Sequence, residues 1–208
     1  ERPKAVLAYG YSFLIDDDDV VTDSTRNWAE YADGDALEML LFPIHPTSAS
    51  VLYRTESISQ VRWNEDSILE DYELYLRLAV RGEFALDKSD PLSAWRIHDH
   101  NTSADFERMM NEWLAAQDRT RAELGLPESE LALRQARLRF RCAKDFLRRG
   151  NRQTAWKLFS ENLGAVERKI DVLTTFFRFA VPRRLFSMMS QWRQRKNFDV
   201  ARSLSQKR

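Results

Sequence analysis

Little in this sequence would cross-link the chain or anchor it in a membrane. Its 208 residues include one cysteine, Cys142, which excludes a disulfide framework and a zinc site built from several cysteines. The helix-forming residues around Cys142 predict a place in a buried core. No apolar run approaches the roughly 18 residues that a spanning helix needs, and the first residues do not form a signal peptide. Because the chain begins at Glu1 and not at a methionine, we expect it to be a piece of a longer protein.

The sequence also lacks net charge, yet its two halves have opposite signs. Residues 1–105 carry 9 Lys and Arg against 21 Asp and Glu, a net of −12, and residues 106–208 carry 23 against 11, a net of +12. The composition, 43% hydrophobic and 31% charged, is that of a globular protein and too apolar for a disordered one. The asymmetry indicates two modules, or an acidic module clasped by a basic one. We expect no nucleic acid as a partner of the acidic half.

Apolar and turn patterns predict an α/β first half and a helical second half. Up to residue 98, short β-prone runs alternate with helical patterns, and Arg81-Gly82 closes the helix that begins at Glu70. The expected strands cover residues 5–15, part of 20–32, 48–53, 83–86 and 91–98, and a shorter helix covers 36–42. The later expected helices cover 106–124, 128–149, 152–163, 166–180 and 182–196. We therefore expect an α/β domain at 1–105 and a basic, all-α extension at 106–208.

The stretch from residue 48 to residue 103 carries four features in order. They are a strand that ends at Arg54, a turn that leads to Glu70-Asp71, a helix with the pattern E-D-Y-x-L-x-L-R-L, and a strand that ends in Trp95, Arg96 and His98. This set resembles the acceptor-side, C-terminal half of inverting family 2 glycosyltransferases, over residues 4–105. The resemblance implies a partial GT-A fold with a Rossmann-like mixed sheet. As a fragment, the chain would lack most of the donor site and be inactive.

The resemblance implies that a sugar moves, with inversion, from a nucleotide-sugar donor to a hydroxyl of a glycan, a lipid-linked sugar or a protein. Such a transfer needs a base that deprotonates the acceptor hydroxyl as it attacks the anomeric carbon. The resemblance gives this role to Asp71, while Glu70 would position the acceptor or the base. A helix N-terminus suits such a carboxylate, because the helix dipole favours its ionised form and a rigid helix fixes its direction.

The leaving nucleoside diphosphate requires positive charge from basic side chains and a metal ion. By the same resemblance, Arg54, Arg77 and Arg96 are candidate substrate-binding residues. His98 is the candidate ligand of a divalent metal, Mn²⁺ or Mg²⁺, in the intact enzyme.

Two positions leave alternatives open. Arg77 also suits a structural ion pair with Glu73 or Asp71, the interpretation that we favour for it. The run Asp16–Asp19 is similar to a metal-binding motif, but it lies too near Asp71 for the family layout, which favours a solvated turn. Metal-dependent phosphoryl transfer through this run is a weaker functional hypothesis. Where the family usually has a glycine before the acidic pair, this chain has Val61-Arg62-Trp63.

The basic extension also has two interpretations. Residues 183–196 mix basic side chains with Leu, Phe, Met and Trp, which fits an amphipathic helix on an anionic membrane surface. Packing on the acidic half explains the opposite charges as well, and we favour it. We expect a cytoplasmic protein, with peripheral contact at the inner face of the membrane as the alternative. The rival to an enzyme is a non-catalytic, degenerate transferase scaffold with a helical protein-interaction module.

Overall fold

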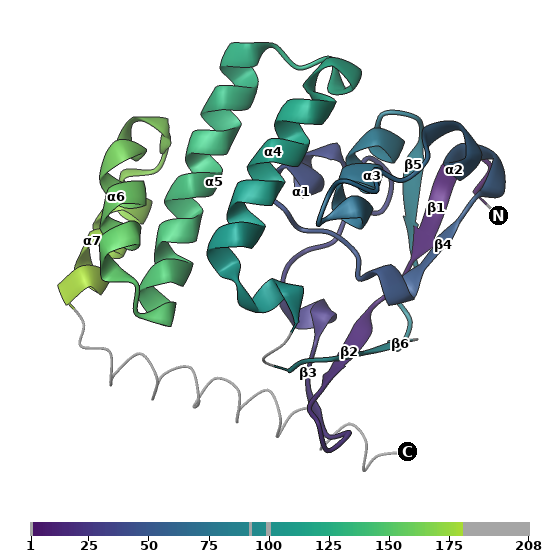
Figure 1. Cartoon of the computed structure of the whole chain (residues 1–208), viewed down its shortest axis with the longest axis horizontal. Coiled ribbons are helices and arrows are strands. Elements are labelled where there is room, and N and C mark those ends of the chain that lie inside the picture. The colour runs from purple at the N-terminus through teal and green to yellow at the C-terminus, as the bar shows by residue number, and fades with distance from the viewer. Residues whose placement is uncertain (1, 92, 99–100, 181–208) are drawn as a thin grey trace. The chain divides into compact units, whose positions relative to one another are not determined.

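The computed structural model describes residues 2–91, 93–98 and 101–180 (Figure 1). The chain forms two compact units, Glu1–Leu131 and Ala132–Arg208, which divide inside a long helix. The first unit mixes strands with helices, and the described residues of the second unit are helical. The predicted class, α/β followed by helices, is therefore confirmed.

Two three-stranded sheets form the β part of the first unit. Their strands are β1 (Ala5–Tyr9), β2 (Ser12–Ile15), β3 (Val21–Ser24), β4 (Val51–Tyr53), β5 (Glu83–Leu86) and β6 (Ser93–Arg96). In one sheet β1 is antiparallel to β4 and parallel to β5, and in the other β2 is antiparallel to β3 and parallel to β6. The prediction of one strand over 5–15 is wrong, because Gly10 and Tyr11 separate β1 from β2 and the two pair in different sheets.

The acidic run Asp16–Asp19 is the turn of the hairpin between β2 and β3. The carboxylate of Asp16 accepts hydrogen bonds from the backbone N–H groups of Asp18, at 3.0 Å, and of Val20, at 2.9 Å. Asp19 has a φ of 62°, a left-handed conformation that aspartate tolerates in turns. The interpretation of this run as a solvated turn is therefore confirmed.

Helix α3 lies at the centre of the first unit, between α4 and the sheet that contains β5 (Figure 1). The helices of this unit are α1 (Leu37–Leu41), α2 (Thr55–Val61), α3 (Glu70–Ala79) and α4 (Phe106–Leu124), with short 3₁₀ turns η1 (Thr25–Asn27), η2 (Ser48–Ser50) and η3 (Thr102–Ala104). Because α3 is covered on both sides, its large apolar residues are fully buried: Tyr72, Leu74, Tyr75, Leu76 and Leu78. Helix α2 was not predicted from the sequence, and α4 was predicted as part of the extension, whereas α4 packs on α3.

Gly82 follows α3 for a different reason from the one expected. A helix-ending glycine commonly adopts a positive φ, but Gly82 does not. A Cβ at Gly82 would lie 2.6 Å from the backbone oxygen of Lys4 and 2.6 Å from Cγ1 of Val6. Glycine is therefore needed because the chain passes very close to β1 as it enters β5.

The second unit consists of the later part of α5 (Glu128–Arg149), α6 (Arg152–Glu161), the 3₁₀ turn η4 (Leu163–Ala165) and α7 (Lys169–Ala180). Gly150, with a φ of 88°, reverses the chain between α5 and α6. Cys142 is buried, as expected, and burial raises the pKa of its thiol to about 12. The expected helix over 182–196 lies outside the described residues.

None of the helices in the described part of the chain combines the length and the apolar character that crossing a bilayer requires.

Candidate functional site

The carboxylate of Asp71 lies in the first turn of α3 and is half-buried. Its Oδ2 accepts a 2.6 Å hydrogen bond from Oγ of Ser48, and its Oδ1 accepts a 2.7 Å hydrogen bond from the backbone N–H of Tyr72. Hydrogen bonds to an ionised carboxylate are among the strong ones, so the direction of this side chain is well defined. Glu70 precedes it in the same turn and is exposed. Both acids lie where the helix dipole favours negative charge.

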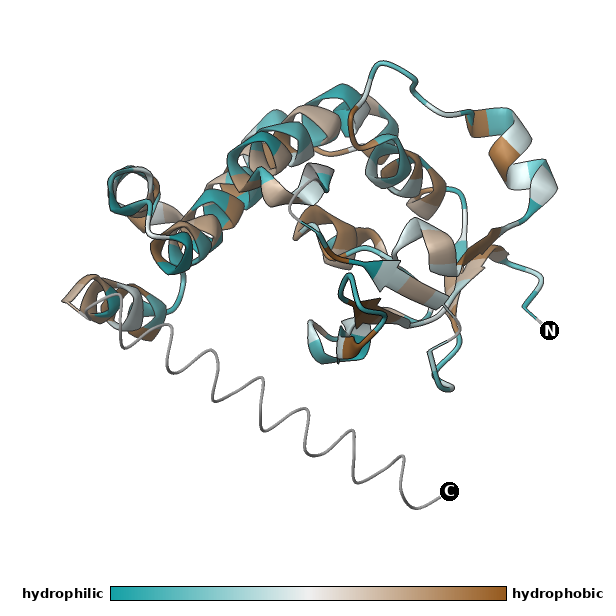
Figure 2. Cartoon of the chain, turned by 60° about the horizontal axis from the view of Figure 1, so that its bottom comes forward, coloured by the Kyte–Doolittle hydropathy of each residue, from teal (hydrophilic) through white to brown (hydrophobic). Residues whose placement is uncertain are grey.

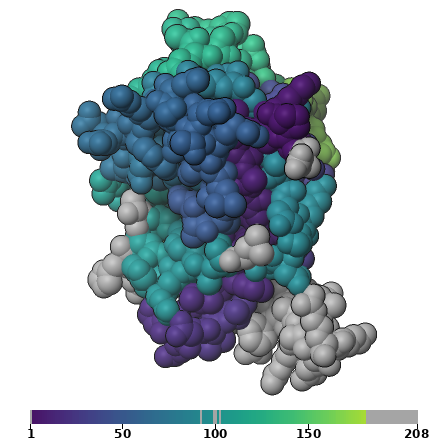
Figure 3. Space-filling view, turned by 90° about the vertical axis from the view of Figure 1, so that its right-hand side faces the viewer, coloured from purple at the N-terminus to yellow at the C-terminus, as the bar shows by residue number. Residues whose placement is uncertain are grey.

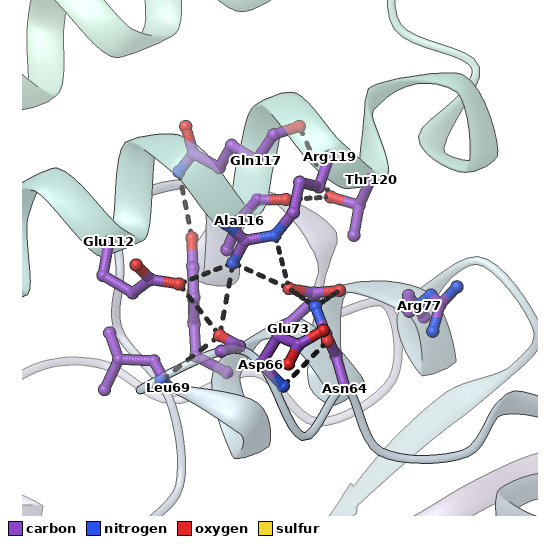
Figure 4. A network of polar contacts seen from close by, with 12 residues as sticks. Asn64, Asp66, Leu69, Glu73, Arg77, Glu112, Ala116, Gln117, Arg119 and Thr120 are labelled. Carbon is purple, nitrogen blue, oxygen red and sulfur yellow. Dashed lines mark hydrogen bonds and ion pairs between the residues drawn. The ribbon is translucent and has the colours of Figure 1, made fainter.

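A buried ionic network fixes the loop that leads into α3 (Figure 4). Glu73, which is 4% exposed, accepts hydrogen bonds from Nδ2 of Asn64 on both carboxylate oxygens, at 3.0 and 3.1 Å, and from Nε of Arg119 at 2.8 Å. Arg119 also donates to Oγ of Ser67 at 3.2 Å and to Glu112 at 2.5 Å. Asn64 and Ser67 precede α3, while Glu112 and Arg119 lie on α4. The network therefore sets the position of the first turn of α3 against α4.

Ser48 is positioned by a group of hydroxyls between β2, β6 and η2. Oγ of Ser12, fully buried in β2, hydrogen-bonds to Oγ of Ser93 in β6 at 2.7 Å and to Oγ1 of Thr47. Oγ1 of Thr47 also hydrogen-bonds to Oγ of Ser50, at 3.1 Å. A hydroxyl can donate and accept at once, so these buried groups satisfy one another. They tie η2, and with it Ser48, to the pair of strands β2 and β6.

An aromatic cluster, made of Tyr53, Tyr75 and Trp63, begins next to Asp71. The ring of Tyr53 stacks on that of Tyr75 with centroids 6.4 Å apart, and its OH donates to the OH of Tyr75 at 3.3 Å. Trp63 meets Tyr53 edge-on at 5.8 Å and is 40% exposed. Figure 3 shows the blue atoms of the segment that contains β4 and α2 at the surface of the first unit.

The two tyrosines of the aromatic cluster are neutral hydrogen-bonding groups. Burial raises the pKa of Tyr75 and of Tyr53 above the usual value of a phenol, and the negative charge of Asp71 adds to the rise in both. Both phenols therefore keep their protons at neutral pH, so each can donate a hydrogen bond near the carboxylate.

The backbone of Arg62 has a conformation that normally requires glycine. Its φ is 60° and its ψ is 159°, a region that residues with a Cβ avoid. Arg62 ends α2 and precedes Trp63, at the place where the family resemblance predicts a glycine. The backbone at this position thus has the conformation of a glycine, although the residue is an arginine.

All three arginines predicted to bind substrate make contacts within the protein. Arg54 precedes α2, and its Nε donates to the backbone oxygen of Ala5 at 2.8 Å. Arg77 forms a 2.9 Å ion pair with Glu123 of α4, so the ion-pair partner expected on α3 itself is wrong. Arg77 also lies six residues beyond Asp71, about 9 Å along the helix axis.

Arg96 and His98 lie at the end of β6, next to the hairpin turn. Nη2 of Arg96 pairs with Oδ1 of Asp19 at 2.5 Å, and its Nη1 donates to the backbone oxygen of Asp16 at 2.6 Å. His98 is exposed. Among the residues that the structure describes, no three His, Cys, Asp or Glu side chains gather as ligands of a metal ion. These residues alone therefore do not fit the expected divalent metal.

Ser48 and the aromatic cluster were not predicted from the sequence as neighbours of the acidic pair. Ser48 and Tyr53 lie in the segment that carries the family resemblance, but they belong to η2 and β4 while Asp71 belongs to α3, so no periodicity within one element joins them. Tyr75 fitted the apolar stripe of a helix and was interpreted as core only. Their proximity results from the packing of β4 and η2 against α3.

No known family model matches this chain, and no curated protein matches it in sequence. The resemblance described above therefore rests on the ordered motifs alone.

Proposed function

We propose that the first unit is the acceptor-side part of an inverting, nucleotide-sugar-dependent glycosyltransferase of the GT-A fold. The observation that supports this most directly is the half-buried carboxylate of Asp71, directed by Ser48 and adjoined by the aromatic cluster. A carboxylate in this setting can accept a proton, and the partly exposed rings of Tyr53 and Trp63 offer a surface for the apolar face of a sugar ring. The glycine-type backbone at Arg62 is a second support, because it lies where the family usually has glycine.

In the proposed reaction the acceptor hydroxyl transfers its proton to Asp71 while its oxygen bonds to the anomeric carbon of the donor sugar. The bond from that carbon to the diphosphate oxygen breaks in the same step, and the leaving diphosphate takes the electron pair. Attack from the side opposite the leaving group inverts the anomeric centre. Glu70, exposed beside the base, would hold a second hydroxyl of the acceptor, which we propose to be a glycan, a lipid-linked sugar or a protein.

Roles for Arg54, Arg77 and Arg96 in substrate binding are part of the proposal, as are a divalent metal near His98 and a cytoplasmic location. No step above is routed through the metal, since the described residues do not assemble a site for it.

A non-catalytic scaffold is the second candidate. It is favoured by the protein partners of the three arginines, each of which has hydrogen bonds that a structural role explains.

The test is nucleotide release from a panel of nucleotide sugars with Mn²⁺ and mixed acceptors, using the longest natural chain that contains these residues. We expect metal-dependent release that falls by about 100-fold or more in Asp71→Asn, since general-base catalysis contributes at least that much. Asp66→Asn, an exposed acid in the preceding loop, is the matched control and should leave release unchanged. No release from any donor, or release unaffected by Asp71→Asn, would favour the scaffold.

A further inference from the structure

Helix α7 exposes four of its large apolar residues and buries a small polar one. Thr175 is fully buried, and its Oγ1 donates to the backbone oxygen of Asp171 at 2.6 Å. Four apolar side chains of the same helix are largely exposed, namely Ile170 at 55%, Leu173 at 52%, Phe176 at 52% and Phe177 at 61%. A helix that faced only water would show the opposite arrangement.

The exposed residues form one continuous face. Ile170, Leu173 and Phe177 are three and four residues apart and so lie on one side of the helix, with Phe176 at its edge. Phe176 contacts Phe177 at 6.4 Å between ring centroids. Hydrophobic residues make up most of α7, as the hydropathy colours of Figure 2 show.

Buried Phe159, together with Phe179 of α7, connects Trp156 of α6 to the edge of this face. Phe159 lies between the two helices, with its ring centroid 6.4 Å from Phe176 and 5.6 Å from Trp156. Trp156 is 48% exposed. We call Trp156, Ile170, Leu173, Phe176 and Phe177 together the α7 face. An exposed apolar patch of this kind marks a site that binds a protein or a membrane.

The charge of the second unit indicates which kind of partner binds the α7 face. Residues 132–180, the described part of the second unit, hold 12 Lys and Arg against 4 Asp and Glu. Lys169 precedes Leu173 by four residues and is exposed on the same side of α7, and Lys157 follows Trp156 directly. Asp171 is the one acid of α7 and lies beside buried Thr175, away from the face.

We propose that the α7 face binds the surface of an anionic phospholipid membrane. The aliphatic and aromatic side chains would enter the boundary between headgroups and acyl chains, with lysines and arginines at the level of the lipid phosphates. Trp156 suits this boundary, because an indole has an apolar body and one polar N–H. A second copy of the chain is a poorer occupant, since two units with this excess of basic residues repel each other. The inference is independent of the proposed enzymatic function.

The test is sedimentation of the full chain with vesicles of phosphatidylcholine alone or of phosphatidylcholine and phosphatidylglycerol in equal parts. We expect binding at least tenfold stronger to the anionic vesicles, and a loss of at least tenfold in the double variant Leu173→Glu, Phe177→Glu. The control is Leu52→Glu, which places the same charge on an apolar residue of β4 that is 77% exposed and should bind like the native chain. The thermal midpoint of the double variant without lipid should be unchanged, because both side chains are exposed.

Three results would overturn the proposal. Equal binding of the double variant and the native chain would mean that charge elsewhere in the chain is sufficient. A fall of several degrees in the thermal midpoint of the double variant would mean that another part of the same chain covers the face. Self-association that the double variant abolishes, without vesicle binding by the native chain, would identify a second copy as the occupant.

Discussion

The hydroxyl of Ser48 donates a 2.6 Å hydrogen bond to the carboxylate of Asp71, which lies 23 residues later in the chain. If Asp71 is the general base, this bond fixes which of its oxygens faces the acceptor. Replacing Ser48 by Ala should therefore lower kcat about tenfold with little change in KM for the donor, since a hydrogen bond to a charged group is worth about 1.5–3 kcal/mol. Steady-state kinetics of nucleotide release would measure both constants. Ser59→Ala, an exposed serine of α2, should change neither, and an unchanged kcat in Ser48→Ala would exclude the positioning role.

Arg62 should be replaceable by glycine with a gain in stability. Its φ of 60° and ψ of 159° cost about 1–3 kcal/mol for a residue with a Cβ. Replacement by glycine removes this cost, but the greater conformational freedom of glycine in the unfolded chain offsets part of the gain. We expect Arg62→Gly to raise the free energy of unfolding by about 1 kcal/mol, measured by urea denaturation. Arg62→Ala removes the guanidinium but keeps the Cβ, so it should not stabilise the protein. A destabilised Arg62→Gly would show that the arginine side chain matters more than the backbone strain.

Glu73 should be important for stability. Its carboxylate is 4% exposed and receives Asn64 and Arg119, so Glu73→Ala leaves the amide of Asn64 without its acceptor. We expect the free energy of unfolding to fall by about 2 kcal/mol. The loss is not larger because the guanidinium of Arg119 can still be hydrated when Glu73 is removed. Glu65→Ala, at an exposed acid of the preceding loop, should change it by less than about 0.5 kcal/mol. Equal effects of the two variants in chemical denaturation would contradict this account.

Alkaline pH should unfold the first unit through its buried phenols. Burial raises the pKa of Tyr31 to about 12 and raises that of several other tyrosines in the same direction: Tyr9, Tyr53, Tyr72 and Tyr75. Below the ordinary phenol pKa of about 10, both folded and unfolded chains keep these protons and stability is fully present. As pH rises further, the unfolded chain loses protons that the folded chain retains, so stability falls.

The urea midpoint at pH 8, 10 and 11 would measure this loss, with phenolate absorbance and circular dichroism recorded together. We expect the phenolate signal of the buried tyrosines to appear only as the helical signal disappears. Complete ionisation of the tyrosines in a chain that is still folded would contradict the prediction.

Periodicity in the sequence was sufficient to predict most elements of the fold. The bounds of β5, α4 and α5 agree with the expected ranges, because their apolar patterns end at clear stop signals such as Gly125 and Gly150. The sequence did not predict α2, whose polar residues form no apolar stripe, or the break that divides residues 5–15 into two strands. That break depends on which strands pair with β1 and β2, which is a property of the whole unit.

The sequence by itself determined that an acidic pair opens a helix, that the chain divides by charge, and that a lone cysteine is buried. These follow from local propensities and composition, which each segment carries on its own. Only the tertiary structure decided that Ser48 and Tyr53 lie beside Asp71, that Arg77 pairs with Glu123, and that α7 turns its apolar residues outward. Such contacts join residues with no fixed spacing in the chain, and the packing of helices against sheets and against one another sets them.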